Sequence, residues 1–238
     1  MIRPGCKRGK LARVRFRFAA VLLLALALPA LALAAHKDPK KQIDTVDQRK
    51  AASVLLKRTD LAAGWKKVPS TSDDDTHFEC AGYDPDGSDL VQTAEAEADF
   101  ERAGGFPSVY SYADVYKTKA NALAAWIRTV KPAMAKCLAT LFKRAIEADG
   151  GKVAIAAAGK IAFPKLAARS AAYRVSLKVS VTENGQTSTV PLTLYAVAFG
   201  SGRGEAGLMA IGFGNSVPIS AVRSLAQLTA KRFAAAKL

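Results

Sequence analysis

A repeated alternation of apolar and polar residues is the feature that most constrains the fold of this chain. Between 92 and 101, Ala94, Ala96, Ala98 and Phe100 alternate with acidic residues. Because successive side chains of a strand point to opposite faces, this period of two predicts a half-buried β-strand. Further strands are predicted at 65–68, 109–116, 153–163, 170–182, 192–199 and 206–213.

Apolar residues at helical spacing predict the remaining elements. We expect helices from Thr45 to near Gly64 and over 118–131, 132–147 and 219–235. Thr45 and Gln48 fit a capping box. The order of these elements predicts an α+β fold, in which helices pack against a single antiparallel β-sheet.

Two glycine-containing segments predict turns between strands. Asn184-Gly185 favours a tight hairpin turn. Gly202, Gly204 and Gly207 match the spacing of a dinucleotide-binding loop, but that loop needs a helix after it. Here both flanks have the strand pattern, so we expect a hairpin turn and no cofactor.

The N-terminal segment has the pattern of a secretory signal. Its first 34 residues carry seven basic residues and no acidic one, and the apolar run from Ala19 to Ala35 follows the basic part. We predict cleavage after Ala34, a flexible leader over 35–44 and a single domain over 45–238. The alternative is an uncleaved membrane anchor, since about 17 apolar residues is the lower limit for a span.

The cysteine count then predicts one disulfide. Cys6 lies in the signal, which leaves Cys80 and Cys137 in the exported chain. An even number of cysteines in an exported protein favours a bridge. Two separate buried thiols are the alternative. His77 lies three residues before Cys80, but we expect no metal site because the cysteine is needed for the bridge.

The charge is less basic than it first appears. The whole chain has a net charge of +15, whereas the 28 basic and 20 acidic residues after the signal leave +8. We therefore expect no nucleic-acid partner. Eleven acidic residues and no Lys or Arg lie between 70 and 101. They predict either a solvated acidic surface opposite basic helices or a site for a cation or basic partner.

Two groups of residues are candidates for binding. Asp84, Asp86 and Asp89 resemble the first half of a calcium loop, although Pro85-Asp86-Gly87 is also an ordinary turn. The second group consists of Tyr110, Tyr112, Tyr116 and Trp126. It forms either a ligand face or part of the core. We predict no catalytic residues.

The arrangement resembles a known group of exported domains. The segment Asp60-Leu-Ala-Ala-Gly-Trp65 follows the first predicted helix, Cys80 precedes a hairpin, Cys137 lies on a later helix, and a Val-rich meander ends in a helix. This is similar to extracytoplasmic sensor-like domains of actinobacteria, such as the extracellular domain of PknH-type kinases and PsbP-like secreted proteins. The resemblance implies binding at the cell envelope. Those kinase domains carry two disulfides, whereas this chain can form one.

These observations lead to one functional expectation and two alternatives. We expect a secreted, non-catalytic, monomeric domain that binds a small ligand or an envelope component. It would meet a membrane only through an uncleaved signal. The first alternative is an envelope protein whose basic helices contact anionic wall polymers. The second is a hydrolase, in which a Ser-His-Asp triad would have to use His77.

Overall fold

The fold is built around one eight-stranded sheet. The computed structural model describes residues 38–70, 80–183 and 186–238. The strand order is β1-β3-β4-β8-β7-β6-β5, and β2 pairs with β3 beside β1. The strands are β1 (Lys40–Lys41), β2 (Trp65–Val68), β3 (Val91–Arg102), β4 (Ser108–Tyr116), β5 (Lys152–Lys160), β6 (Arg169–Glu183), β7 (Gln186–Ser201) and β8 (Gly204–Phe213).

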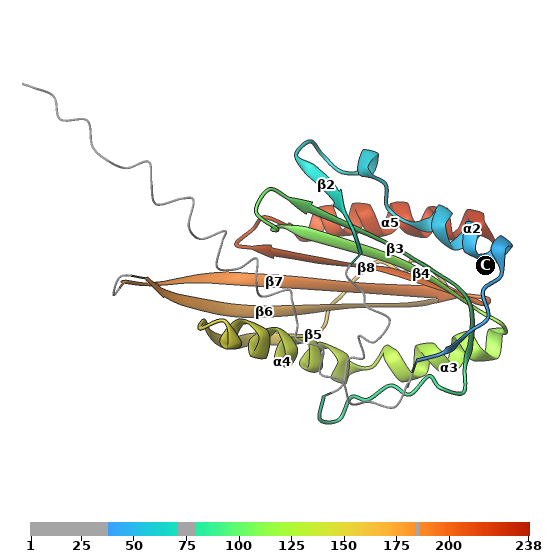
Figure 1. Ribbon diagram of the computed structural model, residues 1–238, viewed down its shortest axis with the longest axis horizontal. Helices are drawn as coiled ribbons and strands as arrows, with labels where there is room; N and C mark the ends of the chain where they lie inside the picture. Colours follow the sequence, from blue (N-terminus) through green and yellow to red (C-terminus); the bar gives the residue numbers. More distant parts are fainter. Residues whose placement is uncertain (1–37, 71–79, 184–185) are drawn as a thin grey trace, which may run out of the picture.

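Helices cover both faces of this sheet. Figure 1 shows α2 (Thr45–Val54) and α5 (Ile219–Ala236) on one face, and α3 (Lys119–Thr129) and α4 (Pro132–Ala148) on the other. The α2/α5 core includes Phe100, Phe199 and Val222, whereas the α4 core includes Leu138 and Val175. The molecule therefore has three layers, with the sheet in the middle.

The α+β class is confirmed, but the sheet is mixed. All neighbouring strands are antiparallel except β1 and β3, which run parallel. Lys40 and Lys41 form β1, although the sequence placed them in a leader. A two-residue strand has too few side chains to show an alternation, so the pattern could not reveal it.

The first helix is shorter than the sequence predicted. It ends at Val54, and a 3₁₀ turn, η1 (Arg58–Asp60), follows. The capping-box prediction is also wrong. Asp44 is the N-cap and accepts hydrogen bonds from two backbone N–H groups. The side-chain N–H of Gln48 instead donates to the backbone carbonyl of Glu95 at 2.6 Å, and the Gln48 side-chain oxygen accepts from the backbone N–H of Glu95 at 3.2 Å. These two hydrogen bonds continue the pairing along the edge of β3.

The later elements follow the predicted order. β3 and β4 form the expected hairpin, and β5 to β8 form the expected meander. Gly202, with a φ of +56°, lies in the turn between β7 and β8, which fits the hairpin interpretation of the glycine spacing. Asn184-Gly185 lies outside the described residues, while Glu183 and Gln186 on either side of it pair with each other.

The signal segment also lies outside the described residues, so its cleavage and the domain boundaries stay predictions. In the part of the chain that the structure describes, none of the helices has the length and apolar character needed to span a membrane.

Candidate functional site

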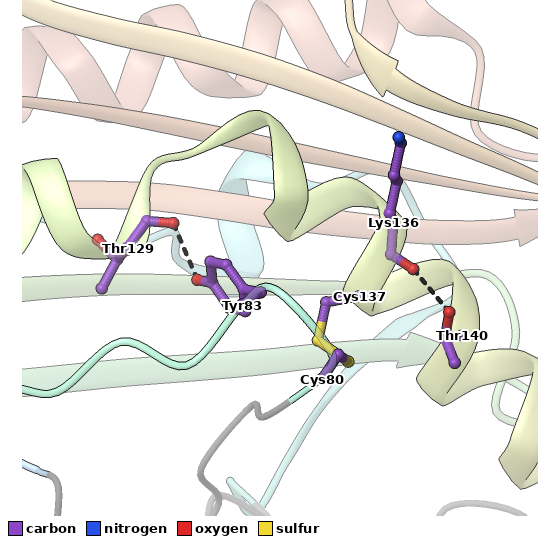
Figure 2. Close-up of a disulfide and its surroundings, with 6 residues drawn as sticks. All are labelled: Cys80, Tyr83, Thr129, Lys136, Cys137 and Thr140. Atoms are coloured by element: carbon purple, nitrogen blue, oxygen red, sulfur yellow. Dashed lines mark hydrogen bonds between the residues drawn. A yellow bond between two sulfur atoms is a disulfide. The ribbon is translucent and has the colours of Figure 1, made fainter.

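The disulfide joins the loop before β3 to helix α4. The sulfur atoms of Cys80 and Cys137 are 1.98 Å apart and the Cα atoms 5.4 Å, and the two positions are separated by 57 in the sequence. Figure 2 shows the bridge beside Tyr83, whose hydroxyl donates to the carbonyl of Thr129 at 2.8 Å. The predicted pairing is confirmed, and the bridge and this hydrogen bond together fasten the loop to α3 and α4.

The hairpin strand β4 divides its side chains between the two cores. Val109, Ala113 and Val115 are buried against α2 and α5. Tyr110 and Tyr112 point to the opposite face, since they occupy the alternate positions. Tyr116 is buried on the α3 side with Ala122 and its neighbours. The three tyrosines therefore lie on the face of the sheet opposite to Val109, Ala113 and Val115.

Each of these tyrosines has a packing role. The Tyr110 hydroxyl donates to Glu97, and its ring stacks on Tyr112 with centroids 5.9 Å apart. The Tyr112 ring lies over Gly207, where an added Cβ would come within 2.7 Å of the ring. A glycine is therefore needed at 207 for this ring to reach the sheet. Burial raises the pKa of both Tyr110 and Tyr112.

Trp126 lies on α3 and packs against the α4 core, whereas Tyr116 belongs to a separate cluster. The guanidinium of Arg169 lies over the indole ring, 5.7 Å from its centroid. The structure thus puts Trp126 beside a cation. The ligand role of the four aromatic residues stays a hypothesis.

A half-buried acid and a buried acid lie on the same face of the sheet as the tyrosines. Asp114 of β4 pairs in register with Glu205 of β8. Glu205 is only 6% exposed, and burial raises its pKa to about 8, although the charge of Arg169 acts in the opposite direction. Burial likewise raises the pKa of Asp114 well above its usual range, while Gln92 donates a 2.8 Å hydrogen bond to it.

This pair of acids was not predicted from the sequence. Asp114 could have been placed on the tyrosine side, because it lies two residues from both Tyr112 and Tyr116. Glu205 gives no such signal, because its position follows only from the register between β4 and β8. One of its carboxyl oxygens is buried without a hydrogen-bond partner among the described residues.

The Asp84–Asp89 loop surrounds a hollow of about 390 Å³ that Arg128 and Lys131 also line. Arg128 forms an ion pair with Asp89, donates to its second carboxyl oxygen at 3.0 Å, and donates to the Asp86 carbonyl at 2.6 Å. A guanidinium thus binds the loop where a cation would have to approach. Among the described residues, no group of three metal-ligating side chains comes together.

The sheet also separates charge between its two edges. β3, near one edge, carries Glu95, Glu97, Asp99 and Glu101. β5, β6 and β7 form the opposite edge, and from 151 to 204 the sequence has seven basic residues and a single acid, Glu183. The acidic strand β3 and the basic strands β5 and β6 therefore lie toward opposite edges of one sheet. The edge beside β3 also carries the lysines of β1 and β2, and Lys41 forms an ion pair with Glu95 there.

No known relative helps to interpret these features. No family model, no curated protein and no solved structure matches the chain. The function of the protein is therefore inferred from the geometry of this chain, and the resemblance to sensor-like domains stays an interpretation of its sequence.

Proposed function

We propose that this protein is exported and acts as a non-catalytic, sensor-like binding domain at the bacterial cell envelope. Export is supported by the signal pattern of residues 1–34 and by the disulfide, since such bonds persist in oxidising compartments. A binding role is supported by one observation in particular, which is an uncovered face of the sheet at its basic edge.

That face belongs to β5, β6 and β7. On β6, Val175, Leu177 and Val179 are buried under α4, whereas the alternate residues Arg174 and Lys178 are exposed on the opposite face. A protein that covers one side of these strands and leaves the other open presents a broad, regular surface. Such a surface suits a partner larger than a small molecule.

A second candidate function is binding of a small ligand near the tyrosines. Its support is the unpaired carboxyl oxygen of Glu205, on the same face of the sheet as Tyr112. A buried acid with an unused acceptor favours either a bound water or a polar ligand atom. The packed position of the Tyr112 ring makes this the weaker candidate.

The proposal is tested by expressing the full chain in an exporting bacterial host. We expect a secreted product whose N-terminus lies at Ala35 or within two residues of it, determined by N-terminal sequencing. The recovered protein should sediment with isolated cell envelopes at low ionic strength. An intact Met1 on the extracellular product would contradict the predicted cleavage. Protein that stays entirely in the supernatant would contradict the binding role.

A further inference from the structure

The uncovered face has a definite composition. We call it the open basic face. It consists of the side chains of β6 and β7 that alternate with the residues buried under α4, together with their neighbours on β5. It carries three basic residues, six hydroxyl-bearing residues and no described acid: Lys152, Arg174, Ser176, Lys178, Ser180, Thr182, Thr187, Thr189 and Thr193.

Hydroxyl groups on this face are held in cross-strand pairs. The side-chain oxygens of Ser180 and Thr189 are 2.7 Å apart, and those of Thr182 and Thr187 are 2.8 Å apart. Each hydroxyl can donate one hydrogen bond and accept others. The pairs therefore form a fixed row of groups that can bind the oxygen atoms of a partner.

The charges on this face are spread along the strands. Arg174 and Lys178 are four residues apart on β6, which corresponds to about 13 Å in an extended strand. Lys152 lies opposite Ser180 on the neighbouring strand and extends the row. The three cations therefore lie in a row along the strands rather than around one point. They fit a linear partner with negative charges at intervals.

The face lacks features expected of a nucleic-acid site. Tyr195, the aromatic residue opposite Arg174, is only 9% exposed and belongs to the α2/α5 core. Single-stranded nucleic acids bind through exposed aromatic rings that stack on the bases. The β6–β7 hairpin extends past β5 and β8 as a two-stranded ribbon, but residues 181–183 and 186–191 of this ribbon include no Lys or Arg to neutralise the phosphates of a duplex.

We propose that the open basic face binds a linear anionic polymer of the cell wall, with one phosphate or carboxylate in each repeat unit. This inference rests on the proposed function and names its partner class. The cations attract the negative groups, and the paired hydroxyls bind oxygen atoms of the backbone. The acidic strand β3 lies toward the opposite edge of the sheet, so its carboxylates are far from a polymer bound to this face.

The experiment compares two triple variants with the same loss of charge. Lys152→Gln/Arg174→Gln/Lys178→Gln neutralises the open basic face. Arg144→Gln/Arg223→Gln/Lys231→Gln neutralises exposed residues of α4 and α5 and is the matched control. The probes are fluorescently labelled poly(glycerol phosphate) and poly-glutamate, and binding to the oxidised full chain is measured by anisotropy. Circular dichroism checks that both variants fold.

We expect the face variant to bind roughly tenfold more weakly than the unchanged protein, and the control roughly as tightly as the unchanged protein. Poly(glycerol phosphate) and poly-glutamate show which anionic group is preferred. Equal losses in both variants would overturn the assignment, because binding would then follow net charge. Stronger binding of a DNA oligonucleotide than of either polymer would overturn it as well.

The inference and the proposed function can fail separately. If the protein sediments with envelopes but binds neither polymer, this inference is wrong and the binding role stands. If sedimentation is retained by the face variant and lost by the control, the basic helices make the contact. If neither sedimentation nor polymer binding occurs, both proposals are wrong.

Discussion

Replacement of Glu205 by Gln should make the protein more stable at high pH. Burial raises the pKa of this carboxyl from 4.5 to about 8, so the folded protein keeps a proton that the unfolded chain releases over this range. Each pH unit then lowers the free energy of unfolding by about 1.4 kcal/mol. Over the whole interval the loss is about 5 kcal/mol.

Glutamine has the same shape as the protonated acid and does not titrate. We therefore expect Glu205→Gln to lie within about 1 kcal/mol of the unchanged protein at pH 4.5 and to be more stable by about 4–5 kcal/mol at pH 8. The charge of Glu205 is one of the causes that raise the pKa of Asp114, so the difference between the two curves reports Glu205 together with its effect on Asp114.

The assay is urea unfolding under non-reducing conditions, followed by circular dichroism at several pH values. Glu101→Gln makes the same chemical change near the end of β3 and corrects for the loss of one acid from the protein. If the free energies of unfolding of Glu205→Gln and the unchanged protein run parallel from pH 4.5 to pH 8, the carboxyl is not desolvated and the reasoning is refuted.

Three further predictions concern the disulfide, an ion pair and the tyrosines. Cys80→Ala should lower the free energy of unfolding by roughly 2–5 kcal/mol in urea titrations, because the bridge to Cys137 closes a long loop. Asp47→Asn removes the carboxylate that pairs with Arg203, whose guanidinium holds the Asp47 pKa below 3.8. The substitution should lower the free energy of unfolding by roughly 2–3 kcal/mol at pH 7, and this loss should disappear as the pH falls below 3.8. Tyr112→Ala should lower the free energy of unfolding by about 2–3 kcal/mol, because it removes a packed ring. A thermal or urea midpoint close to that of the unchanged protein would instead favour the ligand-face hypothesis.

The two strands of the first hairpin were predictable because they show the alternation that their burial requires. The pattern at 92–101 became β3, and Val109 to Tyr116 became β4. The disulfide was predictable because only two cysteines remained after the signal. A period of two in the sequence was enough to predict these strands, and the number of cysteines was enough to predict the bridge.

The positions of the helices and the contact between Asp114 and Glu205 depend on how distant parts of the chain pack, and no local sequence pattern reveals this. Leu55 and Leu56 continued the apolar spacing of the first helix, but they are buried in extended backbone after α2 ends. The sequence also could not indicate that helices cover both faces. An acid in an alternating strand is expected to face water, and only the register shows that Glu205 meets Asp114 beneath α3.

The separation of charge links the fold to the proposed binding mode. The acidic stretch at 70–101 and the basic stretch at 151–204 are far apart in the sequence, and a compact chain could have packed them together and neutralised both. The strand order instead places β3 and β5 toward opposite edges. The ion pairs Arg203–Asp47 and Arg232–Asp60 lie at α2, η1 and α5 and leave Arg174 and Lys178 exposed. Burial of both strands' apolar residues does not require this separation, and it is the arrangement that the proposed binding of an anionic polymer needs, because the carboxylates of β3 then lie far from the cations of the open basic face.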